Sequence, residues 1–198
     1  MINENKQSNF LTIFFVGLTC IFTGGFIGAI TNMINGAVSP NYFRIVMGWD
    51  FENIWIASIA QGIFEGIIYG VIFSLIFTTG FGIITKGKGT FKFALKQLFK
   101  IILIVLSCWT IGGILAMLLA SISPEFYNSH FYDVPKEKTE MLKYAWVGGS
   151  IWGGMIGGLL SAVFGVVVIK NNWKDEIKLN KKPNRQHTLQ AIWVLGLI

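Results

Sequence analysis

The chain has 198 residues, of which 53% are hydrophobic and only 13% are charged, and its mean hydropathy is +0.60. Soluble domains usually carry about 25% charged residues, so this composition excludes a typical soluble domain. The 16 basic and 10 acidic residues give a formal net charge of +6. Most of these charges lie between apolar runs, so they report on membrane topology and give little reason to expect a nucleic-acid partner.

Four apolar runs dominate the chain, at residues 10–38, 54–84, 101–122 and 145–169. Each reaches or exceeds the roughly 20 residues that a helix needs to cross about 30 Å of hydrocarbon. The first run is too long for the apolar core of a signal peptide, so we interpret it as an uncleaved span. We therefore predict an all-α integral membrane protein, with a four-span domain over residues 1–170 and a basic cytoplasmic tail over residues 171–198.

The segments between the runs alternate in charge. The loop after the second run carries five lysines and no acidic residue, and the segment from Lys170 onward carries six basic residues against two acidic ones. The loops after the first and third runs each carry one more acidic than basic residue. Because cytoplasmic loops are enriched in Lys and Arg, we expect both termini on the cytoplasmic side of a bacterial inner membrane.

The two halves of the chain resemble each other, which indicates an internal repeat. CIFTGG (20–25) matches CWTIGG (108–113), AVSPNYF (37–43) matches SISPEFY (121–127), and GIFEGIIYG (62–70) matches SIWGGMIGG (150–158). The first and third matches are offset by 88 residues and the second by 84, a difference of about one helical turn. We predict two tandem helical hairpins, as repeats of about residues 10–85 and 100–170. Hairpins in the same orientation imply a pseudo-two-fold axis along the membrane normal.

Small residues recur at every fourth position of the second and fourth runs. They are Gly62, Gly66 and Gly70 in the second run and Ser150, Gly154 and Gly158 in the fourth. Helices in lipid associate where small side chains let their backbones approach closely, as in a glycine zipper. We therefore predict that the second and fourth spans pack against each other across the pseudo-two-fold axis through these residues. In the alternative arrangement, one of the two stripes packs between protomers.

Glu65 is the only formally charged residue inside the four apolar runs. Gln61 and Tyr69 lie four residues before and after it, so the three side chains share one face of a helix. Asn32 and Asn35 lie in the last turns of the first run, and we expect them at a similar depth. Together these five residues predict a small polar cavity that is open towards the outer side.

The surroundings of Glu65 limit the states that it can adopt. A bare carboxylate at the bilayer centre costs about 3 kcal/mol, and no Lys, Arg or His lies in the apolar runs to pair with it. We therefore expect Glu65 to be protonated and hydrogen-bonded to Tyr69, Gln61 or an Asn, to be hydrated, or to hold a cation. The simpler alternative is that a neutral Glu65 only bonds neighbouring helices together.

The segment KGKGTFKFALKQLFK (86–100) predicts an amphipathic helix on the cytoplasmic surface. Its lysines are spaced four residues apart on one face, where they can meet the anionic headgroups of the bilayer. These membrane-surface residues are Lys88, Lys92, Lys96 and Lys100. The other face of the segment is apolar.

The apolar runs contain no Ser/His/Asp set, phosphate-binding loop, metal motif or pair of haem-binding histidines. We therefore predict that the protein is not an enzyme and that it needs no metal or cofactor. The first functional hypothesis is a structural or accessory subunit of a homo-oligomer or a larger membrane complex, held by its glycine-rich helix faces. The alternative is a small channel or transporter for a proton, a cation or a small solute, which uses the cavity around Glu65.

Overall fold

The computed structural model describes the backbone of residues 2–181 and the side chains of residues 10–177. Within that range all regular structure is α-helical, in six helices: α1 (Ile2–Val38), α2 (Pro40–Met47), α3 (Ile54–Thr85), α4 (Phe91–Ile122), α5 (Pro124–His130) and α6 (Lys138–Lys181). Four stretches are long and apolar enough to cross a membrane: Phe10–Val38, Ile54–Thr85, Phe91–Ile122 and Lys138–Ile177. The predicted class, a helical chain with four candidate membrane spans, is confirmed to this extent.

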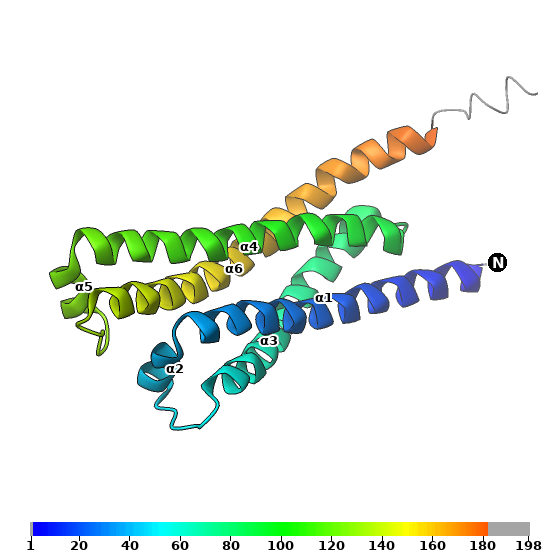
Figure 1. Cartoon of the computed structure of the whole chain (residues 1–198). Helices are drawn as coiled ribbons and strands as arrows, with labels where there is room; N and C mark the ends of the chain where they lie inside the picture. Colours follow the sequence, from blue (N-terminus) through cyan, green and yellow to red (C-terminus); the bar gives the residue numbers. More distant parts are fainter. Residues whose placement is uncertain (1, 182–198) are drawn as a thin grey trace, which may run out of the picture.

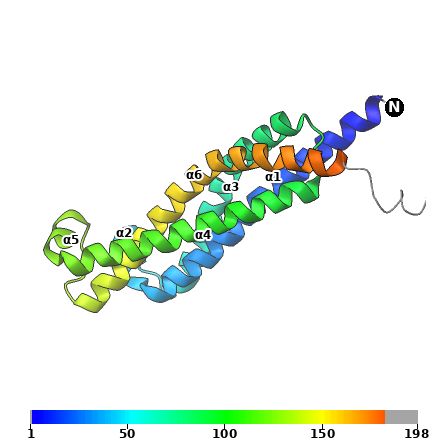
Figure 2. The ribbon, with the colours of Figure 1, turned by 90° about the horizontal axis from the view of Figure 1, so that it is seen from above.

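The four long helices form two pairs. Helix α1 packs along α3, helix α4 packs along α6, and contact between the pairs runs mainly from α3 to α6. Figure 1 shows α4 beside α6 and α1 crossing α3. In Figures 1 and 2 the short helices α2 and α5 lie at one end of the bundle, and the N-terminus lies at the other. Each pair is therefore a long hairpin whose connection contains a short helix.

Local sequence sets the ends of the long helices. The side chain of Asn53 accepts a hydrogen bond from a first-turn N–H of α3, and Thr90 does the same for α4, as N-cap residues do. Helix α3 ends at Lys86 and Gly87, whose φ angles are +51° and +71°. This left-handed conformation closes a helix C-terminus and favours glycine. The turn between α3 and α4 is therefore short and defined.

The basic segment at residues 86–100 forms the turn before α4 and the first turns of α4 itself, so it leads directly into the third candidate span. Helix α4 runs from Phe91 to Ile122 without a break, because no residue near Lys100 stops helix propagation and each further residue adds a hydrogen bond. Its first turns pack on the protein through Phe93, whose ring centroid lies 6.3 Å from that of Phe81 and 5.2 Å from that of Trp173. The lysines remain exposed, at Lys88, Lys92, Lys96 and Lys100.

The predicted tail, residues 171–198, begins as a continuation of α6 through Lys181. The rest of it, from residue 182 onward, lies outside the described residues. Asn172 in this extension donates a hydrogen bond to the side-chain oxygen of Gln97 at 2.5 Å, and Gln97 is buried. This polar pair ties the end of α6 to the beginning of α4.

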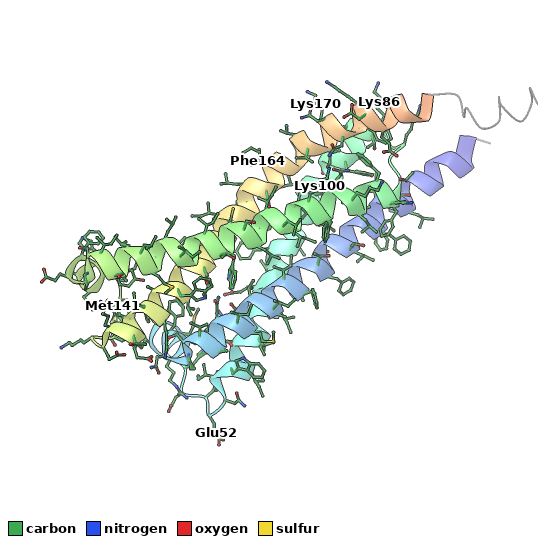
Figure 3. All side chains as sticks on the ribbon, turned by 45° about the horizontal axis from the view of Figure 1, so that its top comes forward. Glu52, Lys86, Lys100, Met141, Phe164 and Lys170 are labelled. Atoms are coloured by element: carbon green, nitrogen blue, oxygen red, sulfur yellow. The ribbon has the colours of Figure 1, made fainter. Side chains whose placement is uncertain are left out.

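Two buried apolar clusters stabilise opposite ends of the bundle. The α2–α5 cluster contains Tyr42, Phe43, Ile54, Ala120, Tyr127, Val134, Met141, Tyr144, Ala145 and Val147. The basic-end cluster contains Val16, Cys20, Phe77, Phe81, Phe93, Ala94, Leu98, Ile101 and Ile169. Charge is segregated in the same way: Figure 3 shows Lys86, Lys100 and Lys170 towards one end and Glu52 at the other.

Within each pair the helices approach closely at glycines. A Cβ atom added at Gly28 would overlap the carbonyl oxygen of Gly62, and one added at Gly66 would overlap that of Gly24. Helices α4 and α6 repeat this arrangement, because a Cβ at Gly112 would overlap the carbonyl oxygen of Gly149. Only glycine allows backbones to approach in this way.

This packing differs from the predicted use of the glycine stripe. Gly62, Gly66 and Gly70 lie against α1, not against α6. The pair Gly24 and Gly28 gives α1 its own row of small residues, and the short connection through α2 keeps α1 next to α3. Helix α3 does contact α6, but further along, where a Cβ at Gly80 would lie 2.8 Å from the side chain of Val166.

The matching residues of α6 have three different surroundings. Ser150 donates a hydrogen bond to Oδ1 of Asn35 in α1, at 3.0 Å. A Cβ atom at Gly154 would lie 3.5 Å from the Trp109 ring, and a Cβ at Gly158 would meet nothing within 4 Å. The row of α6 that packs on α4 lies one residue earlier, at Gly149, Gly153 and Gly157.

Candidate functional site

A cavity of about 180 Å³ lies between the two helix pairs and is only partly enclosed. All four long helices contribute to its wall, and it lies between the two buried apolar clusters. Most of the lining is aliphatic, aromatic or glycine. Polar side chains of the lining include Asn32, Asn35, Glu65 and Tyr69. Four of the five residues predicted to form a polar cavity therefore line one space.

Glu65 lies on α3 and is half-buried. The side-chain amide of Gln61, one turn earlier, donates a hydrogen bond to Oε1 of Glu65 at 2.7 Å. Gln61 itself does not line the cavity, so it holds the carboxyl group of Glu65 in place without contacting the cavity. Among the described residues, no basic side chain forms an ion pair with Glu65 and no donor reaches its second oxygen. One face of the carboxyl group is therefore available to an occupant of the cavity.

Asn35 is a completely buried polar residue of the site, with an exposed fraction of 0%. Its Oδ1 accepts the hydrogen bond from Ser150, but its Nδ2 has no partner among the described residues. Reversing the amide would let it donate to Ser150 and would leave the oxygen unpaired instead, because the two orientations differ only by exchange of N and O. Either way, one polar atom of this side chain lacks a protein partner, and such a group normally bonds to water or a ligand.

Asn32 and Tyr69 complete the polar wall. Asn32 is 5% exposed, and its backbone carbonyl accepts a hydrogen bond from the hydroxyl of Ser58 on α3 at 3.2 Å. Tyr69 lies one turn beyond Glu65 and is 38% exposed. The hydrogen-bond partner that the sequence left open between Tyr69, Gln61 and an Asn is thus Gln61.

Trp109 is a cavity residue that the sequence reasoning missed. It lies on α4, is 9% exposed, and packs edge-to-face on Trp146 with ring centroids 5.4 Å apart. Its indole N–H is buried without a hydrogen-bond partner among the described residues. The available signal was the aligned pair CIFTGG and CWTIGG, in which the first half has Ile21 where the second has Trp109.

The site borders the α2–α5 cluster through Tyr42 on α2. The rings of Tyr42 and Tyr144 lie 5.0 Å apart. Burial, and next the negative charge of nearby Glu65, raise the pKa of Tyr42 above its ordinary value. The phenol of Tyr42 therefore stays protonated at neutral pH.

The predicted packing and surface residues divide between this cavity and other parts of the bundle. Gly62, Gly66, Gly70, Gly154 and Gly158 line the cavity, whereas Ser150 does not. The lysines of the basic segment lie outside it. Among the described residues, no three His, Cys, Asp or Glu side chains come together as a metal site would require. Comparison with known proteins finds no matching family model, no matching curated protein and no matching solved structure.

Proposed function

We propose that this chain is a non-enzymatic membrane protein that admits a cation or a small polar solute to the cavity between its helix pairs, and that it acts as a channel or transporter. One observation carries the proposal: all four long helices line one cavity, and Glu65, the only charged residue of the apolar runs, is on its wall. Polar and ionisable residues at membrane depth mark pathways for ions and solutes. A cation beside Glu65 would offset a charge that is otherwise unpaired.

The glycine contacts favour this function over an accessory subunit. The subunit hypothesis needs a small-residue face that is free to receive a partner helix. Gly24, Gly28, Gly62 and Gly66 pack on each other within the first pair, and Gly112 packs on α6 within the second. These rows are thus used inside the chain and are not free to receive a foreign helix.

The proposal includes a membrane arrangement. The two helix pairs are same-orientation repeats, with both termini in the cytoplasm of a bacterial cell and α2 and α5 at the outer side. The lysines near the turn between α3 and α4 and the basic residues of the α6 extension support this orientation. The polar part of the cavity is then nearer the outer side, because Asn32, Asn35 and Glu65 lie towards the α2 ends of their helices. Four spans are few for a transport pathway, so a homo-oligomer is part of the proposal.

Flux through proteoliposomes tests the function. The purified full chain is reconstituted, and the uptake of protons, Rb⁺ and small neutral solutes is measured for wild type, Glu65→Gln and the loop control Glu52→Gln. We expect at least one solute to be taken up and its rate to fall about tenfold in Glu65→Gln only, which corresponds to about 1.4 kcal/mol in the barrier. Equal rates in wild type and Glu65→Gln would contradict the proposal, and so would purification from native lipid with a stoichiometric foreign subunit and no flux.

A further inference from the structure

The cavity combines one carboxylate with walls that are mainly apolar, and this imbalance indicates the class of its ligand. We propose that the cavity binds an amphipathic organic monocation, an amine or quaternary ammonium, with its charged head beside Glu65 and its apolar body against the aliphatic and aromatic wall. This inference rests on the proposed function, since it names the kind of solute that the cavity admits. It does not follow from that function alone, because a proton or a metal ion would satisfy the function equally well.

The cavity holds one charged ligand, which is a poor match for a divalent metal ion. Ca²⁺ takes six to eight oxygen ligands, usually with several carboxylates, and Mg²⁺ demands near-octahedral geometry. Besides Glu65, with one oxygen already held by Gln61, the lining offers only neutral side-chain oxygens, at Thr23, Thr31, Asn32, Asn35, Tyr69 and Ser161. No cluster of three His, Cys, Asp or Glu side chains exists among the described residues. A small hydrated cation would therefore lose more hydration than this wall replaces.

An organic cation makes smaller demands and gains more. A quaternary ammonium spreads its charge over its alkyl groups and is weakly hydrated, so a single carboxylate partner is enough, and it is also attracted to aromatic faces. Aromatic side chains of the cavity wall are Tyr69, Phe73 and Trp109. Beyond them towards the basic end the wall is aliphatic, with Ile76, Leu98 and Ile101. The carboxylate and the apolar wall thus present two different surfaces to one ligand.

The size of the cavity fits such a ligand. A dry apolar cavity of about 150 Å³ holds a benzene molecule, and this one measures about 180 Å³. Because it is only partly enclosed, a longer body can extend between the helix pairs into the lipid. A benzyl group with an ammonium head is therefore a suitable probe.

Three buried side-chain donors lack a partner among the described residues; those of Asn35 and Trp109 line the cavity, and that of Trp146 does not. The first two indicate that the cavity receives an occupant. Asn35 is completely buried, Trp109 is nine-tenths buried, both line the cavity, and each has an N–H group without a partner among the described residues. A buried donor without a partner loses its hydrogen bonds to water and gains none in return. A water molecule that enters with the ligand would complete these hydrogen bonds.

Equilibrium binding of labelled benzyltrimethylammonium to the full chain in lipid nanodiscs tests this proposal. We expect saturable binding that Glu65→Gln weakens about tenfold and Glu52→Gln leaves unchanged. Tetramethylammonium, which has the head without the body, should compete at least tenfold more weakly, and so should neopentylbenzene, the neutral isostere. Rb⁺ should not compete.

Gly158 provides a second variant that does not depend on Glu65. An added Cβ there meets nothing within 4 Å, and the residue lines the cavity. Gly158→Leu should therefore fill the space and reduce binding of benzyltrimethylammonium at least tenfold, whereas Gly158→Ala should change it less than threefold. A fold check by size-exclusion profile and circular dichroism accompanies each variant.

The outcomes separate this inference from the proposed function. The organic-cation inference is wrong if benzyltrimethylammonium does not bind, or if Rb⁺ competes with it as strongly as unlabelled benzyltrimethylammonium does. If flux of protons or Rb⁺ still depends on Glu65 in that case, the transport function stands. If neither binding nor Glu65-dependent flux is found, both are wrong. Binding that Gly158→Leu abolishes and Glu65→Gln leaves unchanged would also overturn the inference, since the carboxylate would then play no part.

Discussion

Alanine at Gly24 and alanine at Gly158 should change stability in opposite directions, although each substitution adds one methyl group to a helical glycine. At Gly24 the new Cβ would overlap the carbonyl oxygen of Gly66 and lie 2.9 Å from the Cα atom of Gly70. These are backbone atoms, which cannot rotate away as a flexible side chain can. At Gly158 the same atom meets nothing within 4 Å. The pair therefore isolates helix packing from helix propensity.

The magnitudes follow from two opposing effects. Replacing a glycine by alanine in a helix interior gains about 1 kcal/mol of helix propensity. Forcing an extra methyl group into a tight contact costs about 1–3 kcal/mol, and contact with backbone favours the upper end of that range. Gly24→Ala should therefore lower the free energy of unfolding by about 2 kcal/mol, after the gain in propensity is subtracted. Gly158→Ala should raise it by up to about 1 kcal/mol.

Reversible unfolding in mixed micelles measures both values. The full chain is titrated with a denaturing detergent, and loss of helix is followed by circular dichroism for wild type and the two variants. The predicted difference between the variants is about 3 kcal/mol. If Gly24→Ala is as stable as Gly158→Ala, then α1 and α3 do not approach through Gly24 and Gly66, and the argument that the glycines are used within each pair fails.

Three further predictions concern other contacts. Ser150→Ala leaves Asn35 unpaired on both sides of its amide, so the free energy of unfolding should fall by about 1–2 kcal/mol, whereas Ser129→Ala in α5, where the residue is exposed, should have little effect in the same titration. The raised pKa of Tyr42 means that the folded state holds this proton more tightly than the unfolded state does. The contribution of Tyr42 to stability should therefore be constant below about pH 10 and be lost above it. In thermal unfolding, Tyr42→Phe should reduce this loss at high pH. The control Tyr132→Phe, at an exposed tyrosine, should not reduce it. The third prediction concerns the exposed lysines Lys92, Lys96 and Lys100. Replacing them by Gln should weaken the binding of anionic lipid by about 1 kcal/mol for each lysine, as measured by native mass spectrometry. Equal retention of lipid in wild type and variant would contradict their role at the membrane surface.

The sequence predicted the number and kind of the long helices because that signal is simple. An apolar run of 20 residues or more fixes a membrane span by its length. The sequence also drew attention to Glu65, because one glutamate in such a run needs a special environment. Asn32 and Asn35 were assigned to the same site as Glu65 only because we expected them at a similar depth in the membrane. Both line the same cavity as Glu65.

The helix faces could not be predicted, because a one-residue rotation exchanges one row of small residues for another. In α6, the rows that begin at Gly149 and Ser150 look equally suitable in sequence, yet only the first approaches α4 so closely that an added Cβ atom would overlap it. The rotation is decided by tertiary contacts such as the hydrogen bond from Ser150 to Asn35. For the same reason Trp109, an apolar residue among many in α4, gave no sign that its N–H would be left unpaired beside the cavity.

The rate at which a hydrophobic carbodiimide labels Glu65 tests the central claim most directly, because this reagent attacks carboxyl groups in apolar surroundings. Labelling of the reconstituted chain is read residue by residue by mass spectrometry, with and without the solute whose flux depends on Glu65. If that solute occupies the cavity beside the carboxyl group, it should slow labelling of Glu65 severalfold and leave Glu52 unaffected. Labelling of Glu65 at the same rate at saturating solute would contradict the claim that the cavity is the site of binding.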